Sequence, residues 1–437
     1  MLRRELAIAL RAPLTWLGAA LSALLVGHGF VLALDIYTAG SRSVHGNVLM
    51  AREFDPLLGI VRPTLGGLYL AVSLLGPLVA ARGLSVEKER RTLHALLLQV
   101  GSPARVLGAK AVAAGAAIGL QLLAPVALLI AWRIAGGHLD LPETAVALSG
   151  YLLYLGLVGA LSLATAAWTA SLAQAAAAAL VLVAASWAVD ASEGFTALAW
   201  LGRALDWSVT AHLGPFERGT LPTGAILWLV CITAGALLAA WVGLRDDLRR
   251  TTRLTLLAGL GGMALFGAGL AHRVRSIGDL TESRRASLPP AAARALRALP
   301  GPPRLEVWLD RDDARRQQLE RDALAKLRVA RADLEVSYPT DAAESASEAD
   351  RTGPYGVIRI RVGDAERETW STSRRELVTL IFEAAGRSLP DWSQPDYLGY
   401  PLVVEGSRRR ALASLAYLGL PLGLVIAGWF ATRRSRT

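Results

Sequence analysis

Eight apolar runs, each long enough to cross a lipid bilayer, limit what this chain can fold into. They lie at 14–34, 60–81, 107–132, 144–168, 172–189, 223–244, 254–271 and 411–430. The composition agrees, because 53% of the residues are hydrophobic and the mean hydropathy is +0.39, which is too apolar for an ordinary soluble protein. The sequence therefore predicts a mainly α, polytopic membrane protein.

Basic residues gather in alternate connections between these runs. They lie before the first run, between the second and third, and after the sixth: Arg3, Arg4, Arg11, Arg82, Lys88, Arg90, Arg91, Arg105, Lys110, Arg245, Arg249, Arg250 and Arg253. The other connections carry acids: Asp35, Glu53, Asp55, Asp140, Glu143, Asp190 and Glu193. The positive-inside rule then places both termini in the cytoplasm. Topology explains much of the net charge of +10, so we expect no nucleic-acid partner.

Arginine carries nearly all of the positive charge, since Lys88, Lys110 and Lys326 are the only lysines. This bias, with the abundant alanine and glycine, indicates a GC-rich genome more than a function. The single cysteine, Cys231, lies inside an apolar run, so neither a disulfide within the chain nor a cysteine metal site can form. The few methionines and the scattered histidines offer no clustered ligands for copper.

The loop between the second and third runs, 84–110, organises the chain and reads LSVEKERRTLHALLLQVGSPARVLGAK. Leu93, Leu96 and Leu97 are spaced i, i+3, i+4 and share one face of a helix. This spacing predicts a short amphipathic helix on the membrane surface at about 84–100. The alternative is a solvated charged loop without a dedicated partner.

The same loop resembles the signature of type-2 ABC transporter permeases, in Glu87-Lys88-Glu89, Thr92-Leu93, Leu96-Leu97, Ser102-Pro103 and Gly108-Ala109-Lys110. In that family the segment is the coupling helix, which docks into a groove of a separate ATPase subunit. Two positions depart from the family pattern: Arg91 replaces a usual glycine and His94 a usual glutamate. The resemblance implies these ATPase-contacting residues: Glu87, Lys88, Glu89, Arg90, Thr92, Leu93, Leu96 and Leu97.

Two further segments of 1–250 fit a six-span permease core. Residues 1–13 form a basic amphipathic lead-in that resembles the interfacial helix before the family's first span. A signal peptide is the alternative, but the first apolar run is too long and lacks a clear cleavage site. The run HLGPFERGTLP at 212–222 resembles the family's external loop before the sixth span. A seventh span at 251–271 and an eighth with a basic tail at 411–437 complete the membrane part.

Residues 272–410 are predicted to form a small extracytoplasmic α/β domain. Strands are expected at 304–310 and 334–338, a hairpin at 355–362 and 366–370 around Gly363-Asp364, and helices at 312–330 and 373–386. Ser373 and Glu376 have the spacing of a capping box, and 341–350 reads as a flexible loop. Arg408, Arg409 and Arg410 lie on the outer side, which long external domains tolerate.

This domain resembles the auxiliary subunit of gliding-motility-type ABC transporters. The resemblance lies in Asp279-Leu280-Thr281-Glu282, Arg284-Arg285, Ser287-Leu288, Leu296 and the strand that follows Pro302. In those systems the auxiliary protein is usually a separate chain, with one span, an external α/β region and a final span. Here it is expected to be fused to the permease and shortened.

Polar positions inside the spans are few. Gln121 and Gln174 either line a path or bond a neighbouring helix, and structural bonding is the favoured reading. Gly115-x-x-x-Gly119 is a weak match to a helix-packing motif.

The chain has no phosphate loop of the form Gly-x-x-x-x-Gly-Lys-Ser/Thr, so we expect no enzyme activity and no cofactor of its own. ATP and Mg would bind to a partner ATPase, present in two copies beside a homodimer of this chain. We expect it in the bacterial inner membrane, in contact with lipid, with 272–410 outside and available to an envelope partner. The alternative is an integral-membrane scaffold whose external domain docks an envelope partner without transport.

Overall fold

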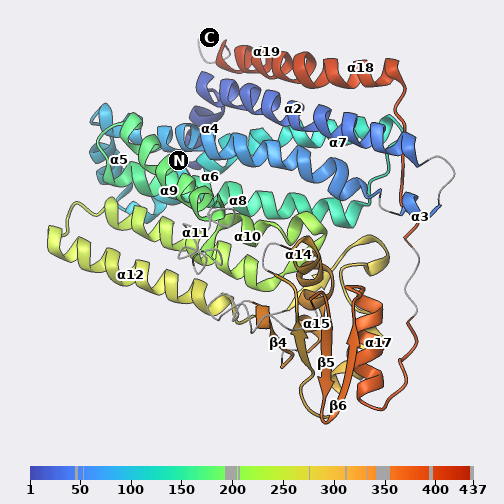
Figure 1. The fold of residues 1–437 in the computed structure, drawn as a ribbon. Coiled ribbons are helices and arrows are strands. Elements are labelled where there is room, and N and C mark those ends of the chain that lie inside the picture. Colours follow the sequence, from blue (N-terminus) through green and yellow to red (C-terminus); the bar gives the residue numbers. More distant parts are fainter. Residues whose placement is uncertain are drawn as a thin grey trace. The chain divides into compact units, whose positions relative to one another are not determined.

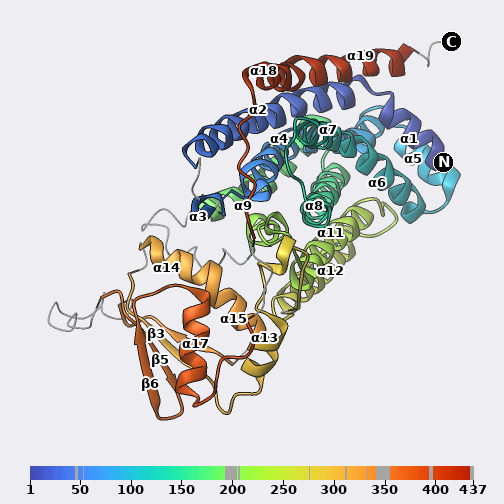
Figure 2. The same ribbon diagram turned by 90° about the vertical axis from the view of Figure 1, so that its right-hand side faces the viewer.

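The computed structural model describes residues 1–44, 48–52, 54–191, 204, 207–274, 276–310, 313–331, 333–340, 355–392 and 397–433. The chain divides into two compact units (Figures 1 and 2). The helical unit comprises Met1–Leu280 and Leu398–Thr437, and the α/β unit comprises Thr281–Tyr397. The second unit is therefore an insertion between two helices of the first.

The helical unit contains, among the described residues, eight helical segments long and apolar enough to cross a membrane. Each includes one predicted run, so the prediction of a mainly helical, multi-pass protein is confirmed. They are α2 (Pro13–Ser43), η1 with α4 (Leu57–Val61, Arg62–Glu89), α6, η2 and α7 (Pro103–Gly119, Leu120–Leu122, Leu123–Ile134), α8 (Leu141–Trp168), α9 (Leu172–Ala191), α11 (Thr223–Gly243), α12 (Arg250–Ala271), and α18, η9 and α19 (Gly406–Ser414, Leu415–Gly419, Leu420–Arg433). Shorter helices are α1 (Leu2–Leu10), α3 (Val48–Ala51), α5 (Leu93–Val100), α10 (Val209–Leu213) and the turn η5 (Phe216–Arg218).

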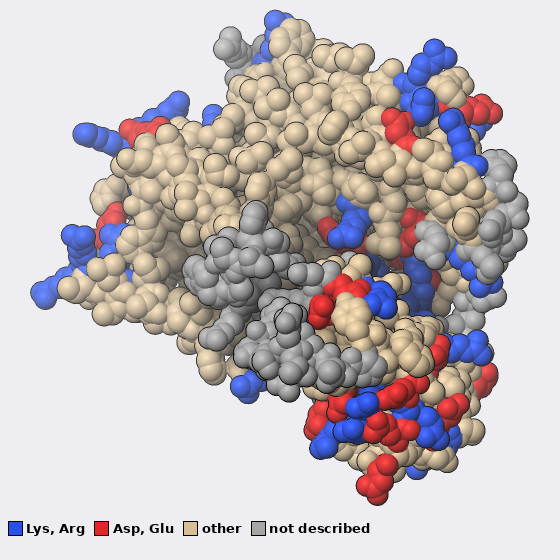
Figure 3. Space-filling view, in the orientation of Figure 1, with Lys and Arg blue, Asp and Glu red and all other residues tan. Residues whose placement is uncertain are grey.

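Helices α2, α4, α8 and α11 form the centre of the helical unit, around buried aromatic rings such as Phe30, Trp132 and Tyr154. Helix α12 packs on α11 and α19 packs on α2, at opposite edges of the unit (Figures 1 and 2). Figure 3 shows the charged side chains of this unit mostly at the helix ends, with a broad uncharged surface between them. That distribution suits a protein surrounded by lipid.

Close helix contact in this unit depends on glycines other than the predicted pair. A Cβ at Gly67 would lie 2.8 Å from the Leu25 carbonyl oxygen, so only glycine lets α4 approach α2 here. A Cβ at Gly115 or Gly119 would meet nothing within 4 Å. The Gly115-x-x-x-Gly119 motif therefore makes no close packing contact within the chain.

The α/β unit is a four-stranded sheet in the order β4-β3-β5-β6, with its own apolar core. Its elements are α13 (Pro290–Arg297), β3 (Arg304–Val307), α14 with η7 and α15 (Ala314–Leu319, Glu320–Leu324, Ala325–Ala330), β4 (Glu335–Ser337), β5 (Ile358–Val362), β6 (Ala365–Thr369) and α17 (Arg374–Ala384), with the turn η6 (Glu282–Arg284) before them. Strand β3 is parallel to β4 and antiparallel to β5. The predicted hairpin is confirmed, since Val362 pairs with Ala365 across Gly363-Asp364 and Gly363 has φ +60°.

The predicted capping box at Ser373 is wrong. The Ser373 side chain makes no cap hydrogen bond, although the residue does precede α17. Glu376 instead accepts a 2.5 Å hydrogen bond from the Thr369 hydroxyl, which ties α17 to β6. This bond, with one from Ser371, holds the pKa of the Glu376 carboxyl below its usual range. The predicted loop at 341–350 lies outside the described residues.

Two short segments of the helical unit flank the insertion. Strand β2 (Ile277–Asp279) pairs antiparallel with β1 (Thr220–Pro222), so Asp279 of the Asp-Leu-Thr-Glu segment lies opposite Thr220 of the 212–222 run. Residues 398–404, which we call the strap, lead back to α18. At Gly399, with φ +72°, a Cβ would overlap the Ala51 carbonyl oxygen, so the strap needs glycine here.

Tyr400 fastens the strap to the core. Its ring stacks on His138 at a centroid distance of 3.6 Å, and its carbonyl oxygen accepts a 2.7 Å hydrogen bond from the Tyr37 hydroxyl. Further along, Arg409 of α18 forms a 3.3 Å ion pair with Asp35 of α2. That ion pair gives one of the three arginines on the expected outer side a local partner.

Candidate functional site

The loop 84–110 folds as a helix end, a tight turn and a short helix. Helix α4 runs on to Glu89, beyond the apolar run, and the turn that follows places Arg91 at φ +59°. A left-handed backbone is easiest for glycine, so the arginine at this position carries backbone strain. Helix α5 then spans Leu93–Val100 and ends at Gly101, which is also left-handed at φ +67°. The Ser102 hydroxyl accepts a hydrogen bond from Arg105 N and begins α6.

Glu87, Lys88 and Glu89, which we call the charged triplet, each hold a different helix. Lys88 Nζ donates hydrogen bonds to the carbonyl oxygens of Ala166, Ala167 and Thr169, at 3.1, 2.8 and 2.5 Å. These carbonyls belong to the carboxyl end of α8. A cation there also matches the negative end of the helix dipole.

Glu89 makes the corresponding contact at the amino end of the next helix, α9. The Glu89 carboxylate accepts a 2.8 Å hydrogen bond from Leu172 N, the first residue of α9. A carboxylate at a helix amino end satisfies a free N–H group and the positive end of the dipole. Adjacent residues at the end of α4 therefore fasten both sides of the α8–α9 turn.

Glu87, the third member, forms a 2.8 Å ion pair with Lys110 of α6. Lys110 Nζ also donates to Glu5 of α1 at 3.1 Å and to the Gly83 carbonyl oxygen at 2.9 Å. The Lys110 side chain is 1% exposed and that of Glu5 is 5% exposed. A buried lysine with two carboxylates and a carbonyl thus joins the amino-terminal helix to α4 and α6.

Helix α5 is amphipathic, and the predicted apolar face points toward the chain itself. Leu93 is buried in the main core, Leu97 packs against that core, and Leu96 is half-buried. The exposed residues of α5 include His94 and Leu98, and Leu98 is 71% exposed. Glu89, Arg90 and Thr92, which precede α5, are also exposed. The structure thus separates the expected contact residues into an inward group, which includes Glu87 and Lys88, and an outward group. Leu98 is an exposed apolar residue that the spacing argument missed.

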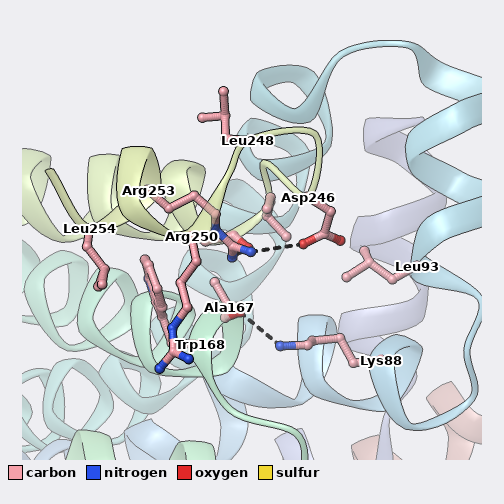
Figure 4. A pocket seen from close by; sticks show the side chains of 11 residues that line it. Lys88, Leu93, Ala167, Trp168, Asp246, Leu248, Arg250, Arg253 and Leu254 are labelled. Atoms are coloured by element: carbon pink, nitrogen blue, oxygen red, sulfur yellow. Dashed lines mark hydrogen bonds and ion pairs between the residues drawn. The ribbon is translucent and has the colours of Figure 1, made fainter. Parts of the chain in front are cut away.

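A pocket of about 650 Å³ lies beside this loop, where α4, α8 and α11 end and α12 begins. Its wall includes Lys88, Leu93, Trp168, Asp246, Arg250 and Arg253. Figure 4 shows Arg250 extending from the start of α12 toward Trp168, Arg253 directed toward Asp246, and Lys88 directed toward Ala167. We call it the α8–α12 pocket.

Arg253 shapes one side of this pocket. Its guanidinium donates to the Gly243 carbonyl oxygen at 2.6 Å, forms a 3.3 Å ion pair with Asp246, and lies 5.1 Å from the centroid of the Trp168 ring. The Trp168 indole N–H donates to the Ala239 carbonyl oxygen of α11 at 2.9 Å. Contacts within the chain therefore fix the side chains of Arg253 and Trp168 in this wall.

Sequence reasoning named Lys110 only as part of the signature and missed Glu5 and the α8–α12 pocket, but one signal was present. In an arginine-rich chain, all three lysines make specific hydrogen bonds: Lys88 and Lys110 as above, and Lys326 to the Arg285 carbonyl oxygen. An ammonium group is a compact charge with three donors, and Lys88 and Lys110 each use it on several acceptors. Both of these lysines lie in the loop 84–110.

Within the described part of the chain, neither of the two glutamines in the spans hydrogen-bonds a neighbouring helix, which contradicts the favoured reading. Gln174 accepts a 3.2 Å hydrogen bond from Ala170 N, in the turn just before α9. Gln121 lies at η2, where the third span changes its winding, and both of its amide atoms are buried without a hydrogen-bond partner in the described part of the chain. A more extensive polar cluster lies elsewhere. In it, Ser73 and Tyr154 are joined by a 2.5 Å hydrogen bond, and Tyr69 contacts Tyr154 and Trp187.

Among the described residues, no group of three or more His, Cys, Asp or Glu side chains is placed to hold a metal ion. The features described above are ion pairs, helix-end contacts and the α8–α12 pocket, and the first two hold helices together. Comparison of the chain with protein-family models, with curated proteins and with solved structures finds no match.

Proposed function

We propose that this chain is the membrane subunit of an ABC transporter and acts as a homodimer with two copies of a separate ATPase. ATP hydrolysis in the partner would drive substrate export or mechanical work in the cell envelope. The resemblance of the 84–110 loop introduces this proposal. The contacts of the charged triplet support it, because they supply a path from the loop into the membrane helices.

That path is short and consists of charged hydrogen bonds. A push on α5 acts on the end of α4, which is bonded to α8 through Lys88, to α9 through Glu89 and to α6 through Glu87. Hydrogen bonds to charged groups are among the stronger noncovalent links in proteins. Movement of a docked partner would therefore reach three spans at once.

The proposal includes a location and an orientation. The chain would lie in the bacterial inner membrane with both termini, α5 and the α8–α12 pocket in the cytoplasm. The α/β unit would lie outside, where it would dock an envelope partner or take part in gating. The arginine clusters before α2, between α4 and α6, and before α12 support this orientation.

Co-purification of this chain with a co-expressed candidate ATPase that carries a Walker motif tests the proposal. Leu98→Asp removes exposed apolar area from α5, and burial of one leucine is worth about 1.5–3 kcal/mol, or roughly tenfold or more in affinity. We expect the variant to lose the ATPase from detergent extracts while eluting normally on size exclusion. Leu141→Asp is the matched control, because Leu141 is 77% exposed but lies at the other end of α8. Equal retention of the ATPase by both variants contradicts docking at α5.

The scaffold alternative has one structural feature in its favour. The α/β unit has its own core, and the outward face of its sheet carries alternating charges, with Arg359 and Arg361 paired to Glu306, Glu366 and Glu368. A separately folded, charged domain is a common form of docking module. The scaffold reading requires that no ATPase co-purifies with the unmodified chain, which the same experiment measures.

A further inference from the structure

We infer that the α8–α12 pocket binds the phosphate of an anionic phospholipid, with the acyl chains lying along α12. This inference does not depend on the ATPase partner, since it concerns only contacts between this chain and the bilayer. Three observations support it: the positive charge of the pocket wall, the unused hydrogen-bond donors of two arginines, and the apolar face of α12 that continues from the pocket mouth.

The wall of the pocket has an excess of positive charge. It contains three cations, Lys88, Arg250 and Arg253, but a single carboxylate, Asp246. The Lys88 ammonium is bonded to neutral carbonyl oxygens at the end of α8, so no carboxylate is hydrogen-bonded to it. The balance of these four side chains is +2, which an anionic phosphodiester would reduce.

Two of the cations have unused donors. The Arg250 side chain makes no hydrogen bond or ion pair with the residues that the structure describes. In Arg253 the Nη atoms are engaged, but Nε is buried and lacks a partner within the described ranges. Guanidinium groups match the geometry of phosphate oxygens and bind them through paired N–H groups.

The start of α12 adds further donors. Its N-cap residue, Arg249, makes no side-chain cap hydrogen bond, so the first N–H groups of this 22-residue helix lack a side-chain acceptor. Such groups and the helix dipole favour a phosphate. Arg250, in the first turn, lies at the same place.

The surface beyond the pocket mouth favours a lipid over a soluble anion or a protein side chain. Leu254 lines the pocket, and Ala258, Gly261 and Leu265 follow it on the same face of α12 at spacings of four, three and four. Leu254 and Leu265 are 49% and 54% exposed, and a Cβ at Gly261 would meet nothing within 4 Å. A cationic pocket matches the phosphate of a phospholipid, and an apolar, shallow helix face that begins at the pocket matches its acyl chains.

Native mass spectrometry of the full chain in detergent, titrated with phosphatidylglycerol, tests the inference. We expect phosphatidylglycerol to bind at least fivefold more tightly than phosphatidylethanolamine. Arg250→Glu should weaken phosphatidylglycerol binding by at least fivefold. Arg105→Glu is the matched control, because the same charge change is made at an exposed residue of the neighbouring loop that does not line the pocket and does not belong to α12, and it should change binding by less than twofold. Unchanged elution and melting temperature establish that both variants are folded.

A second variant distinguishes a lipid from a free phosphate. Gly261→Leu fills the apolar face of α12 without altering any charge, and should weaken phosphatidylglycerol binding while leaving any binding of soluble glycerol phosphate unchanged. The inference is overturned if Arg105→Glu and Arg250→Glu have equal effects, or if glycerol phosphate displaces the lipid at equal concentration. It is also overturned if Arg250→Glu retains the lipid but loses the ATPase, since an acidic partner side chain would then be the occupant.

Discussion

Lys88 of α4 and Ala167 of α8 are joined by a 2.8 Å hydrogen bond from the lysine ammonium to the backbone carbonyl oxygen. The bond connects the end of the second span to the end of the fourth, 79 residues later in the chain. Together with the adjacent Glu89–Leu172 bond, it attaches the loop between the second and third spans to the α8–α9 turn.

Replacing Lys88 by Met should loosen the α8–α9 turn. Hydrogen bonds to a charged group contribute about 1.5–3 kcal/mol, so a lower melting temperature in detergent is expected. If the proposed function holds, the ATPase should still co-purify, but its activity should no longer respond to the permease. Arg90→Met is the control, because Arg90 is an exposed cation two residues away. Equal melting temperatures for the two variants would rule out a structural role for the Lys88 bonds.

Lys110→Met should destabilise the protein more strongly than Lys88→Met. The change leaves the buried Glu5 carboxylate without its cation, and removal of one partner of a buried ion pair typically costs 3–5 kcal/mol. Adding Glu5→Gln to the variant should recover part of the loss, which thermal unfolding can measure. Arg105→Met, an exposed change on the same helix, should have little effect. If the second substitution makes the protein less stable still, the pair is not the cause.

Cysteine labelling tests the orientation. In a Cys231→Ser background, Asp364→Cys lies in the exposed hairpin turn of the α/β unit and Gln99→Cys lies in the exposed last turn of α5. An impermeant maleimide should label the first in cells with a permeabilised outer membrane. It should label the second only after lysis. The reverse pattern inverts the proposed topology.

Removing Thr281–Tyr397 should leave the helical unit folded, because β2 and the strap both stay in place. With a flexible Gly/Ser linker in its place, we expect the shortened chain to dimerise and to retain the ATPase while losing its cellular function. Size-exclusion chromatography, co-purification and complementation measure these three properties. Full complementation means that the unit is dispensable, and loss of the dimer means that it is an assembly element.

The sequence by itself determined the membrane spans and much of the α/β unit. Burial in lipid demands long apolar runs, so the spans are visible in composition alone, as at 144–168 and 223–244. The hairpin around Gly363-Asp364 is equally local, because a two-residue turn needs specific backbone angles at those two positions. The spacing of Leu93, Leu96 and Leu97 predicted the face of α5 but not the direction in which it points.

Only the tertiary structure decided which charges meet. Lys110 and Glu5 are 105 residues apart, and nothing in the sequence around either one names the other as its partner. The capping box at Ser373 does not form for a related reason, because the Glu376 carboxylate accepts a hydrogen bond from the Thr369 hydroxyl of a neighbouring strand. Short-range patterns follow from the geometry of one helix or turn, whereas ion pairs and pockets depend on how separate helices pack, which small local differences in glycine and side-chain volume control.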